Sequence, residues 1–167
     1  MLAIDANVVV RYLVDDDHDQ FLRACRLVES EPIFVADTVL LECEWVLRSG
    51  YGFEARQFAA ALRALAGLPT VRLESPQIAA VALAWHEQGM DFADALHLAG
   101  ADGCEAFATF DRRLAKTAAR LGATPVRALC SAQNRMALRA RSFGSAPRQP
   151  VTMISRTRFD RPAPASE

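Results

Sequence analysis

The sequence predicts an α/β fold, a three-layer α/β/α sandwich with a central parallel sheet. Short apolar runs alternate with amphipathic helical segments between residues 2 and 129, and this alternation is typical of parallel strands covered by helices on both faces. The chain has 167 residues, 51% of them hydrophobic, which suits one globular domain with a core of its own.

Clear helix ends mark the elements in the first half of the chain. Acidic residues 15–17 stand at the start of a helical segment, where the helix dipole favours negative charge. Gly50 and Gly52 end the next helical segment, and Gly67 with Pro69 ends the one after it. We therefore expect strands over residues 2–5 and 32–37, and helices over residues 7–15, 15–30, 38–52 and 54–67.

The same alternation continues in the second half. Ser75 is placed to cap a helix that has Pro76 in its first turn. We expect strands over residues 70–74, 105–111 and 124–129, and helices over residues 75–89, 91–100 and 112–122. From residue 131 the periodicity disappears while Arg, Pro, Ser and Gln accumulate, which predicts a domain over residues 1–130 and a disordered tail over residues 131–167.

The net charge of −1 hides an asymmetry between these two parts. Residues 1–130 contain twelve Lys and Arg against eighteen Asp and Glu, whereas the tail contains seven Arg against two acidic residues. An acidic domain is poorly suited to bind nucleic acid by general attraction, because contacts to phosphate dominate that affinity. If this domain handles nucleic acid, bound divalent cations must neutralise it locally.

Several features indicate a cytoplasmic protein. No apolar run approaches the roughly 20 residues of a membrane span, and the N-terminus lacks the basic and small-residue features of a signal peptide. No two cysteines form a Cys-x-x-Cys pair, so we expect all four to be small buried residues in a reducing compartment, at the positions Cys25, Cys43, Cys104 and Cys130.

Four carboxylates occur where a parallel sheet gathers functional groups, at the carboxyl ends of its strands. Asp5 and Asp111 close predicted strands, Asp94 lies in the first turn of a helix, and Glu42 interrupts an apolar helical segment. Gathered in one pocket, these charges would repel one another unless a cation neutralised them. Mg²⁺ or Mn²⁺ prefers such oxygen ligands and supports phosphodiester hydrolysis by activating a water. The pattern predicts a metal-dependent nuclease.

Each carboxylate also has an ordinary structural alternative. Asp5 and Asp111 each precede a helix and can serve as its N-cap. Asp91, three residues before Asp94, has the position of a helix cap as well. Glu42 can point into solvent. These alternatives stay open on the sequence alone.

Four segments together resemble the PIN domain, and specifically the VapC-type toxins of toxin–antitoxin systems: "IDANVVVRYLVDDD", "VLLECEWVLRSGYG", "DFADALHLA" and "FATFDRRL". Each motif is short, but the four occur in the family's order and cover residues 2 to 128. The resemblance implies an Mg²⁺- or Mn²⁺-dependent endoribonuclease that leaves a 5′-phosphate and a 3′-hydroxyl. It also implies a homodimer inhibited by a VapB-type antitoxin protein.

By position, the family's acidic residues match the four carboxylates identified above, Asp5, Glu42, Asp94 and Asp111. Asp91 matches an accessory acidic position of many members. Thr109 matches a Ser or Thr beside the metal, and Asn7 matches a small polar residue that supports the first Asp. One departure is Ala6, which stands where relatives commonly carry a hydroxyl.

Other interpretations use the same residues. A haloacid-type phosphatase requires a second Asp where this chain has Asn7, and a receiver domain requires a lysine at a strand end, whereas the only lysine is Lys116 in a helical segment. A catalytically silent module whose acidic groove binds a protein partner remains the alternative.

The remaining polar and aromatic candidates have secondary roles. The histidines are expected on the surface or in helix packing, and His97 alone lies near the site, one turn after Asp94. Core packing is the expected role of the aromatic residues Trp45, Tyr51 and Phe53, with a partner groove as the alternative. Contacts to the RNA backbone are assigned to Arg11, Arg48, Arg112 and Arg113.

Overall fold

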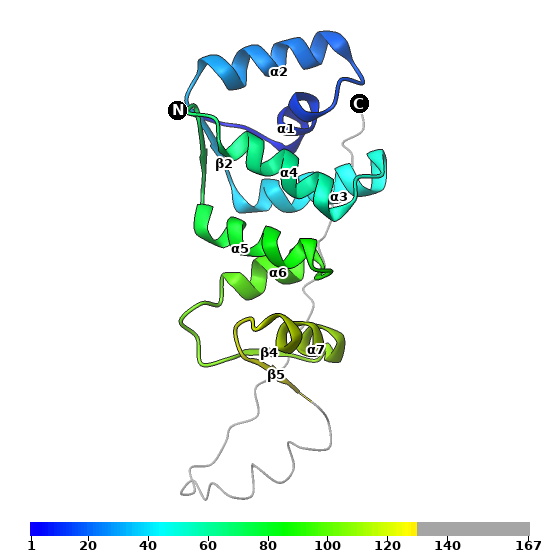
Figure 1. The fold of residues 1–167 in the computed structure, drawn as a ribbon. Helices are drawn as coiled ribbons and strands as arrows, with labels where there is room; N and C mark the ends of the chain where they lie inside the picture. The colour runs from blue at the N-terminus through cyan, green and yellow to red at the C-terminus, as the bar shows by residue number, and fades with distance from the viewer. Residues whose placement is uncertain (130–167) are drawn as a thin grey trace, which may run out of the picture. The chain divides into compact units, whose positions relative to one another are not determined.

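The structure, a computed structural model, describes residues 1–129 (Figure 1). The tail predicted for residues 131–167 lies outside the described residues. Every predicted strand and helix of residues 1–129 is present, although the strands are shorter than expected. In chain order the elements are β1 (Leu2–Ala3), α1 (Ala6–Leu13), α2 (His18–Ser30), β2 (Ile33–Val35), α3 (Asp37–Tyr51), α4 (Ala55–Ala66), β3 (Val71–Leu73), α5 (Pro76–Glu87), α6 (Phe92–Ala99), β4 (Phe107–Thr109), α7 (Arg112–Leu121) and β5 (Val126–Ala128).

All strand pairs in the described chain are parallel, which confirms the predicted α/β class. The strands nevertheless form two sheets where one central sheet was expected: β1-β2-β3 and β4-β5. Strand β1 is only two residues long, and the amides of Leu2 and Ile4 donate to the carbonyls of Pro32 and Phe34 beside it. The ladder at β1 is therefore short, and its described pairing is with β2 alone.

Helix ends follow the local signals of the sequence. Gly52 ends α3 with φ of 69°, a left-handed conformation that glycine adopts without steric cost. Pro76 occupies the first turn of α5 as predicted. Ser75 holds the N-cap position, but its side chain makes no capping hydrogen bond there.

The core lies where the helices pack against β2 and against one another. Its fully buried members include Ile33 and Val35 of β2, Leu40 and Leu47 of α3, and Phe58 of α4. Helix α5 packs along α6, and α4 packs on the other side of α5. Figure 1 shows α5 and α6 as neighbouring helices. This packing fixes the position of α6, which has the candidate carboxylates Asp91 at its N-cap and Asp94 in its first turn.

Three aromatic residues and three cysteines test the predicted core. Tyr51 and Phe53 pack partly buried against it, whereas Trp45 is 61% exposed on α3, so the prediction for Trp45 was wrong. Cys43 is buried and Cys25 is half-buried, but Cys104 is exposed. The polar turn around Cys104 follows α6 and lies outside any helix or strand, which explains the incorrect prediction for this residue. Within residues 1–129, no helix has the length and apolar character to cross a membrane.

Candidate acidic active site

Three carboxylates share one polar pocket of about 380 Å³. Asp91 and Asp94 reach it from the N-terminus of α6, and Asp111 reaches it from the junction between β4 and α7. Arg113 and Thr117 of α7 also line the pocket. The pocket therefore joins two segments that are far apart in the sequence, as predicted for Asp94 and Asp111.

Asp91 caps helix α6, as its position in the sequence predicts. Its Oδ1 accepts from the amides of Ala93 at 3.0 Å and Asp94 at 3.3 Å. The apolar face that follows is buried, with Phe92 and Leu96 packed in the core. This anchoring fixes the first turn of α6, on which Asp94 sits.

Asp111 caps helix α7 in the same manner. Its Oδ1 accepts from the amides of Arg113 at 2.6 Å and Leu114 at 3.2 Å. The Oγ1 of Thr109 accepts from the backbone amide of Asp111 at 3.0 Å, so Thr109 supports the turn that carries this carboxylate. Both capping contacts of Asp111 use Oδ1, so Oδ2 takes no part in capping the helix.

The three carboxylates act on one another through their charges. Partial burial raises the pKa of Asp94 above its usual range, and the negative charges of Asp91 and Asp111 raise it further. His97 of α6 opposes this shift, which agrees with the predicted position of His97 near the site. A cation in the pocket would relieve the repulsion.

The first Asp of the predicted set follows β1 and caps α1. Asp5 Oδ1 accepts from the amide of Val8 at 3.0 Å, and the side-chain amide of Asn7 donates to Asp5 Oδ2 at 3.4 Å. The capping alternative is therefore correct as a structural role for Asp5. Asn7 contacts this carboxylate at the position expected of a supporting residue.

Helix α3 contains two glutamates whose environments differ. Glu42 is exposed, so the apolar surroundings suggested by its neighbours in sequence are not those of its side chain. The buried carboxylate is that of Glu44, which is 6% exposed and pairs with Arg48 Nε at 2.8 Å. Two residues turn a helix by about 200°, so these side chains point to opposite sides. No pattern in the sequence distinguishes Glu44 as the buried glutamate.

The charges of Asp5 and Glu42 both act on one buried thiol, that of Cys43. Burial raises the pKa of Cys43 to about 12, with smaller contributions from the negative charges of Glu42 and Asp5. The Sγ of Cys43 approaches the carbonyl oxygen of Ala6 at 3.9 Å, which ties α3 to the start of α1. Asp5 and Glu42 are thus a second pair of carboxylates whose charges are felt by the Cys43 thiol.

Residues 2–120 match the PIN domain family, a span that contains every carboxylate described above. The chain belongs to the PIN domain family. PIN domains are generally nucleases that act on RNA, and they typically use divalent metal ions. The sequence matches none of the curated proteins with which it was compared.

The donor set of this PIN domain suits a hard divalent cation, because it consists of carboxylate oxygens. Within residues 1–129, however, no three His, Cys, Asp or Glu side chains stand close enough together to hold a metal ion in this conformation. The carboxylates of Asp91, Asp94 and Asp111 share a pocket, and those of Asp5 and Glu42 do not line it, although their charges both raise the pKa of Cys43. The chemistry of the residues fits a metal, while the two groups are not joined in one ligand cluster.

Of the arginines considered for RNA contacts, Arg113 lines the acidic pocket. Arg11 is engaged with Asp16 and donates to Gln20 at 3.1 Å, and Arg48 is engaged with Glu44. Their ion pairs give Arg11 and Arg48 structural roles in this domain.

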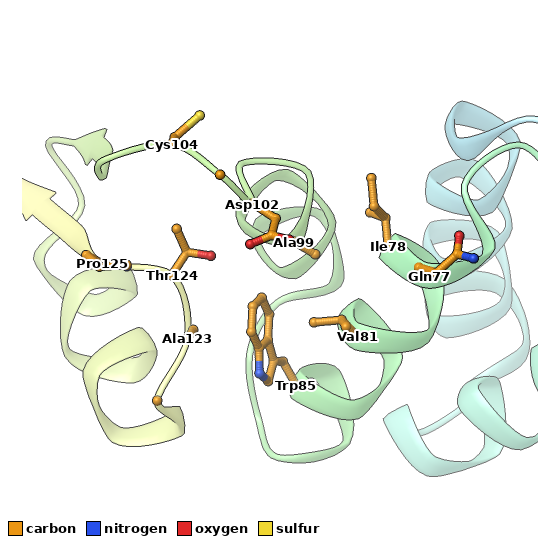
Figure 2. A pocket seen from close by; sticks show the side chains of 12 residues that line it. Gln77, Ile78, Val81, Trp85, Ala99, Asp102, Cys104, Ala123, Thr124 and Pro125 are labelled. Carbon is orange, nitrogen blue, oxygen red and sulfur yellow. The ribbon is translucent and has the colours of Figure 1, made fainter.

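A second pocket, of about 510 Å³, lies away from these carboxylates. Trp85 and Val81 of α5 face it from one side, and Thr124 and Pro125 line it from the segment before β5 (Figure 2). Asp102 contributes one carboxylate to it. Because none of the predicted site residues lines this pocket, the acidic pocket is the candidate active site.

Proposed function

We propose that this PIN domain is an Mg²⁺- or Mn²⁺-dependent endoribonuclease and that its acidic pocket is the catalytic centre. The observation that carries this proposal is the grouping of Asp91, Asp94 and Asp111 in one polar pocket, where burial and then the charges of Asp91 and Asp111 raise the pKa of Asp94. Such mutual repulsion is costly in a protein that has no cation to place there. Membership of a nuclease family supports the same conclusion.

Asp94 and Asp111 are the principal ligands in this proposal, with Asp91 as an accessory ligand. Asp5 and Glu42, whose charges both act on Cys43, complete the set. A bound divalent cation supplies an activated water and neutralises charge on the phosphodiester. The protein holds the ligands rigidly, because Asp5, Asp91 and Asp111 are each fixed by backbone amides at a helix start.

Arg113 is the residue that we propose contacts the RNA phosphate. It lines the acidic pocket together with the carboxylates and follows Asp111 by two positions, which supports this role. A guanidinium group binds phosphate through two parallel hydrogen bonds. This charge compensates in part for the acidic surface of the domain.

The biological setting that we propose is that of a cytoplasmic toxin in a toxin–antitoxin pair. The motifs from Asp5 to Asp111 support this setting through their resemblance to VapC-type toxins. In this proposal the protein is a homodimer, and a VapB-type antitoxin holds it inactive. A short upstream reading frame encoding a small DNA-binding protein would support the pairing.

The decisive experiment incubates purified, partner-free protein with total RNA in Mg²⁺, in Mn²⁺ and in EDTA. The same assay is run with Asp94→Asn and Asp5→Asn, and Asp19→Asn of α2 serves as the matched control because it is exposed and lies outside the pocket. Cleavage by the wild type and by the control, lost in EDTA and in both site variants, is the expected result. Cleavage that persists in EDTA and in the site variants contradicts the metal mechanism.

Metal binding is measured separately by titrating Mn²⁺ in a calorimeter. We expect binding by the wild type and a weaker signal for Asp94→Asn. An equal loss in Asp5→Asn would mean that Asp5 belongs to the same metal site. Protein that binds no Mn²⁺ and cuts no RNA, yet retains a protein partner through its acidic pocket, would favour the silent binding module.

A further inference from the structure

Two polar side chains are buried in the apolar core behind the acidic pocket. Glu44 of α3 is 6% exposed and His86 of α5 is 8% exposed, and these are the buried polar or charged residues of the described chain. Burying such groups costs free energy unless each has a partner. Neither residue lines the acidic pocket, so a direct part in phosphodiester chemistry does not explain them.

His86 is bound to the turn that leads into α6. Its Nδ1 lies 2.8 Å from the carbonyl oxygen of Met90, and because a carbonyl only accepts, Nδ1 carries the hydrogen. Met90 is 3% exposed and directly precedes Asp91, the N-cap of α6. The imidazole therefore satisfies a buried carbonyl at the entry to the helix that bears Asp94.

The imidazole ring is also packed against the first residue of α6. Its centroid lies 5.5 Å from that of Phe92 and 6.0 Å from that of Phe58, both in edge-on contacts. Phe92 and Phe58 in turn meet edge-on at 5.0 Å. The ring is thus held between α4 and α6, and it contacts the α6 entry on both sides of Asp91.

Glu44 lies next to this ring and next to Arg48. Its Oε1 lies 3.9 Å from His86 Nε2 and 2.8 Å from Arg48 Nε. The charge of Arg48 interacts in turn with that of Asp91. Glu44 therefore faces both His86, which binds the turn, and Arg48, which attracts the cap of α6.

The turn is closed by its own backbone and is also contacted by side chains. It reverses the chain between α5 and α6 through Gly89, whose φ of 93° is accessible to glycine at no steric cost. Its own backbone closes it through the amides of Gly89 and Met90, which donate to His86 and Trp85. Two side chains add contacts to this turn: from the core, His86 Nδ1 donates to the Met90 carbonyl at 2.8 Å, and Arg120 of α7 donates to the Gln88 carbonyl at 3.0 Å.

We propose that His86, supported by Glu44, is a positioning residue that fixes the turn over residues 88–90 and thereby sets Asp91 and Asp94 in the acidic pocket. The functional part of this inference rests on the proposed nuclease activity. The structural part, that His86 fixes the turn over residues 88–90, does not rest on that activity, because it can be measured in the metal-free protein.

The test compares two substitutions at one position. His86→Asn places an amide N–H where Nδ1 stands and preserves the bond to Met90, whereas His86→Phe preserves the aromatic packing and removes the donor. Glu44→Gln is a second variant that keeps the shape of its side chain. Val28→Ala, in the buried face of α2, is the control for a general loss of stability.

Hydrogen–deuterium exchange of the peptide spanning residues 88–95 is the primary measurement. In His86→Phe we expect exchange about tenfold faster at these amides, in line with loss of a buried hydrogen bond. We expect near-normal exchange in His86→Asn and a smaller increase in Glu44→Gln. Val28→Ala should leave this peptide unchanged relative to its neighbours. Exchange in His86→Phe and Glu44→Gln equal to that of the wild type overturns the proposal.

Mn²⁺ affinity and RNA cleavage then test the functional part. His86→Phe should bind Mn²⁺ on the order of 10-fold more weakly and lower kcat with little change in KM for RNA, and His86→Asn should restore both. If the wild type cuts no RNA but the exchange pattern appears, the nuclease proposal fails and the positioning role stands. If the wild type cuts RNA while His86→Phe retains full Mn²⁺ affinity and kcat, the functional part is overturned.

Discussion

The carboxylates of Asp94 and Asp111 share one pocket, and the charge of Asp111 raises the pKa of Asp94. Asp94 lies in the first turn of α6, and Asp111 caps α7. This relationship between two helix starts is what converts a pair of ordinary acidic residues into a candidate metal site. The effect of this arrangement on the free energy of unfolding can be measured without substrate.

Asp94→Asn should stabilise the metal-free protein while removing cleavage. The amide ends the repulsion with Asp91 and Asp111, and because Asp94 is partly exposed we expect a gain of up to about 1 kcal/mol in the free energy of unfolding. The rate of cleavage should fall on the order of 100-fold or more. Substituting groups that only support metal ligands already lowers metal affinity or activity by about 10–100-fold. Urea unfolding in EDTA and an RNA assay in Mg²⁺ provide the two measurements.

The sign of the pH dependence follows from the raised pKa of Asp94. A group whose pKa is raised by folding favours the folded state at low pH, where it is protonated, and disfavours it as the pH rises through that pKa. The advantage of Asp94→Asn over the wild type should therefore be full at pH 7 and shrink as the pH falls below the raised pKa. An advantage that stays constant from pH 7 to pH 3 would contradict the assigned repulsion.

Asp111→Asn and Asp111→Ala should separate helix capping from chemistry. Asparagine caps a helix about as well as aspartate, whereas alanine costs about 1 kcal/mol at this position. We expect a near-normal melting temperature for the first variant and a lower one for the second, with cleavage lost in both. Full cleavage by Asp111→Asn would mean that Asp111 acts only as a helix cap.

The two glutamates of α3 should respond in opposite ways. Glu42 is exposed, so Glu42→Gln should change the free energy of unfolding by less than about 0.5 kcal/mol but impair cleavage. Glu44→Gln weakens a buried ion pair whose arginine is 52% exposed, so we expect a loss of about 1–3 kcal/mol. Urea unfolding and RNA cleavage on both variants test this contrast, which fails if Glu42→Gln is the more destabilised of the two.

Cys43 and Cys104 should differ in reactivity toward iodoacetamide at pH 8. The thiolate is the reactive form, and burial keeps the Cys43 thiol protonated by raising its pKa to about 12, whereas Cys104 is exposed. Mass mapping should show Cys104 modified first and Cys43 only after unfolding. Early modification of Cys43 would show that α3 opens at its contact with α1.

Stability at high pH provides a second test of Cys43. In the unfolded chain a thiol ionises near pH 8.5. Above that pH, its ionisation lowers the free energy of unfolding by about 1.4 kcal/mol per pH unit while the folded thiol stays protonated. The raised pKa of folded Cys43 means that its contribution to stability is present below pH 8.5 and is lost toward pH 12. Cys43→Ala should lower stability overall but show a flatter decline above pH 8.5 than the wild type.

Much of the fold could be predicted from local sequence. The element order came from hydrophobic periodicity, and the helix starts came from residues such as Pro76 and Asp91, whose effects act within one turn. The positions of Asp5 and Asp111 after strands followed from the same alternation. Local rules also predicted that both would cap a helix, because capping needs only amides two or three residues away.

Several failures of sequence reasoning concern which residues of a segment face the core. Helix α3 is apolar on several sides, so its sequence did not distinguish Glu42 from Glu44, and it suggested burial for Trp45, which is exposed. Exposure of Cys104 followed from its place in the polar turn between Asp102 and Glu105, which was not recognised from the sequence. Burial is a property of the neighbours that an element meets in space.

By itself the sequence determined the α/β class, the order of the elements and the acidic residues at their starts. Only the tertiary structure decided that Asp91, Asp94 and Asp111 share a pocket, that Cys43 is buried within the influence of the Asp5 and Glu42 charges, and that His86 contacts the turn before α6. Periodicity and capping arise from contacts within a few residues. A shared pocket and a buried pair instead depend on how separate elements pack, and no local pattern specifies that distance.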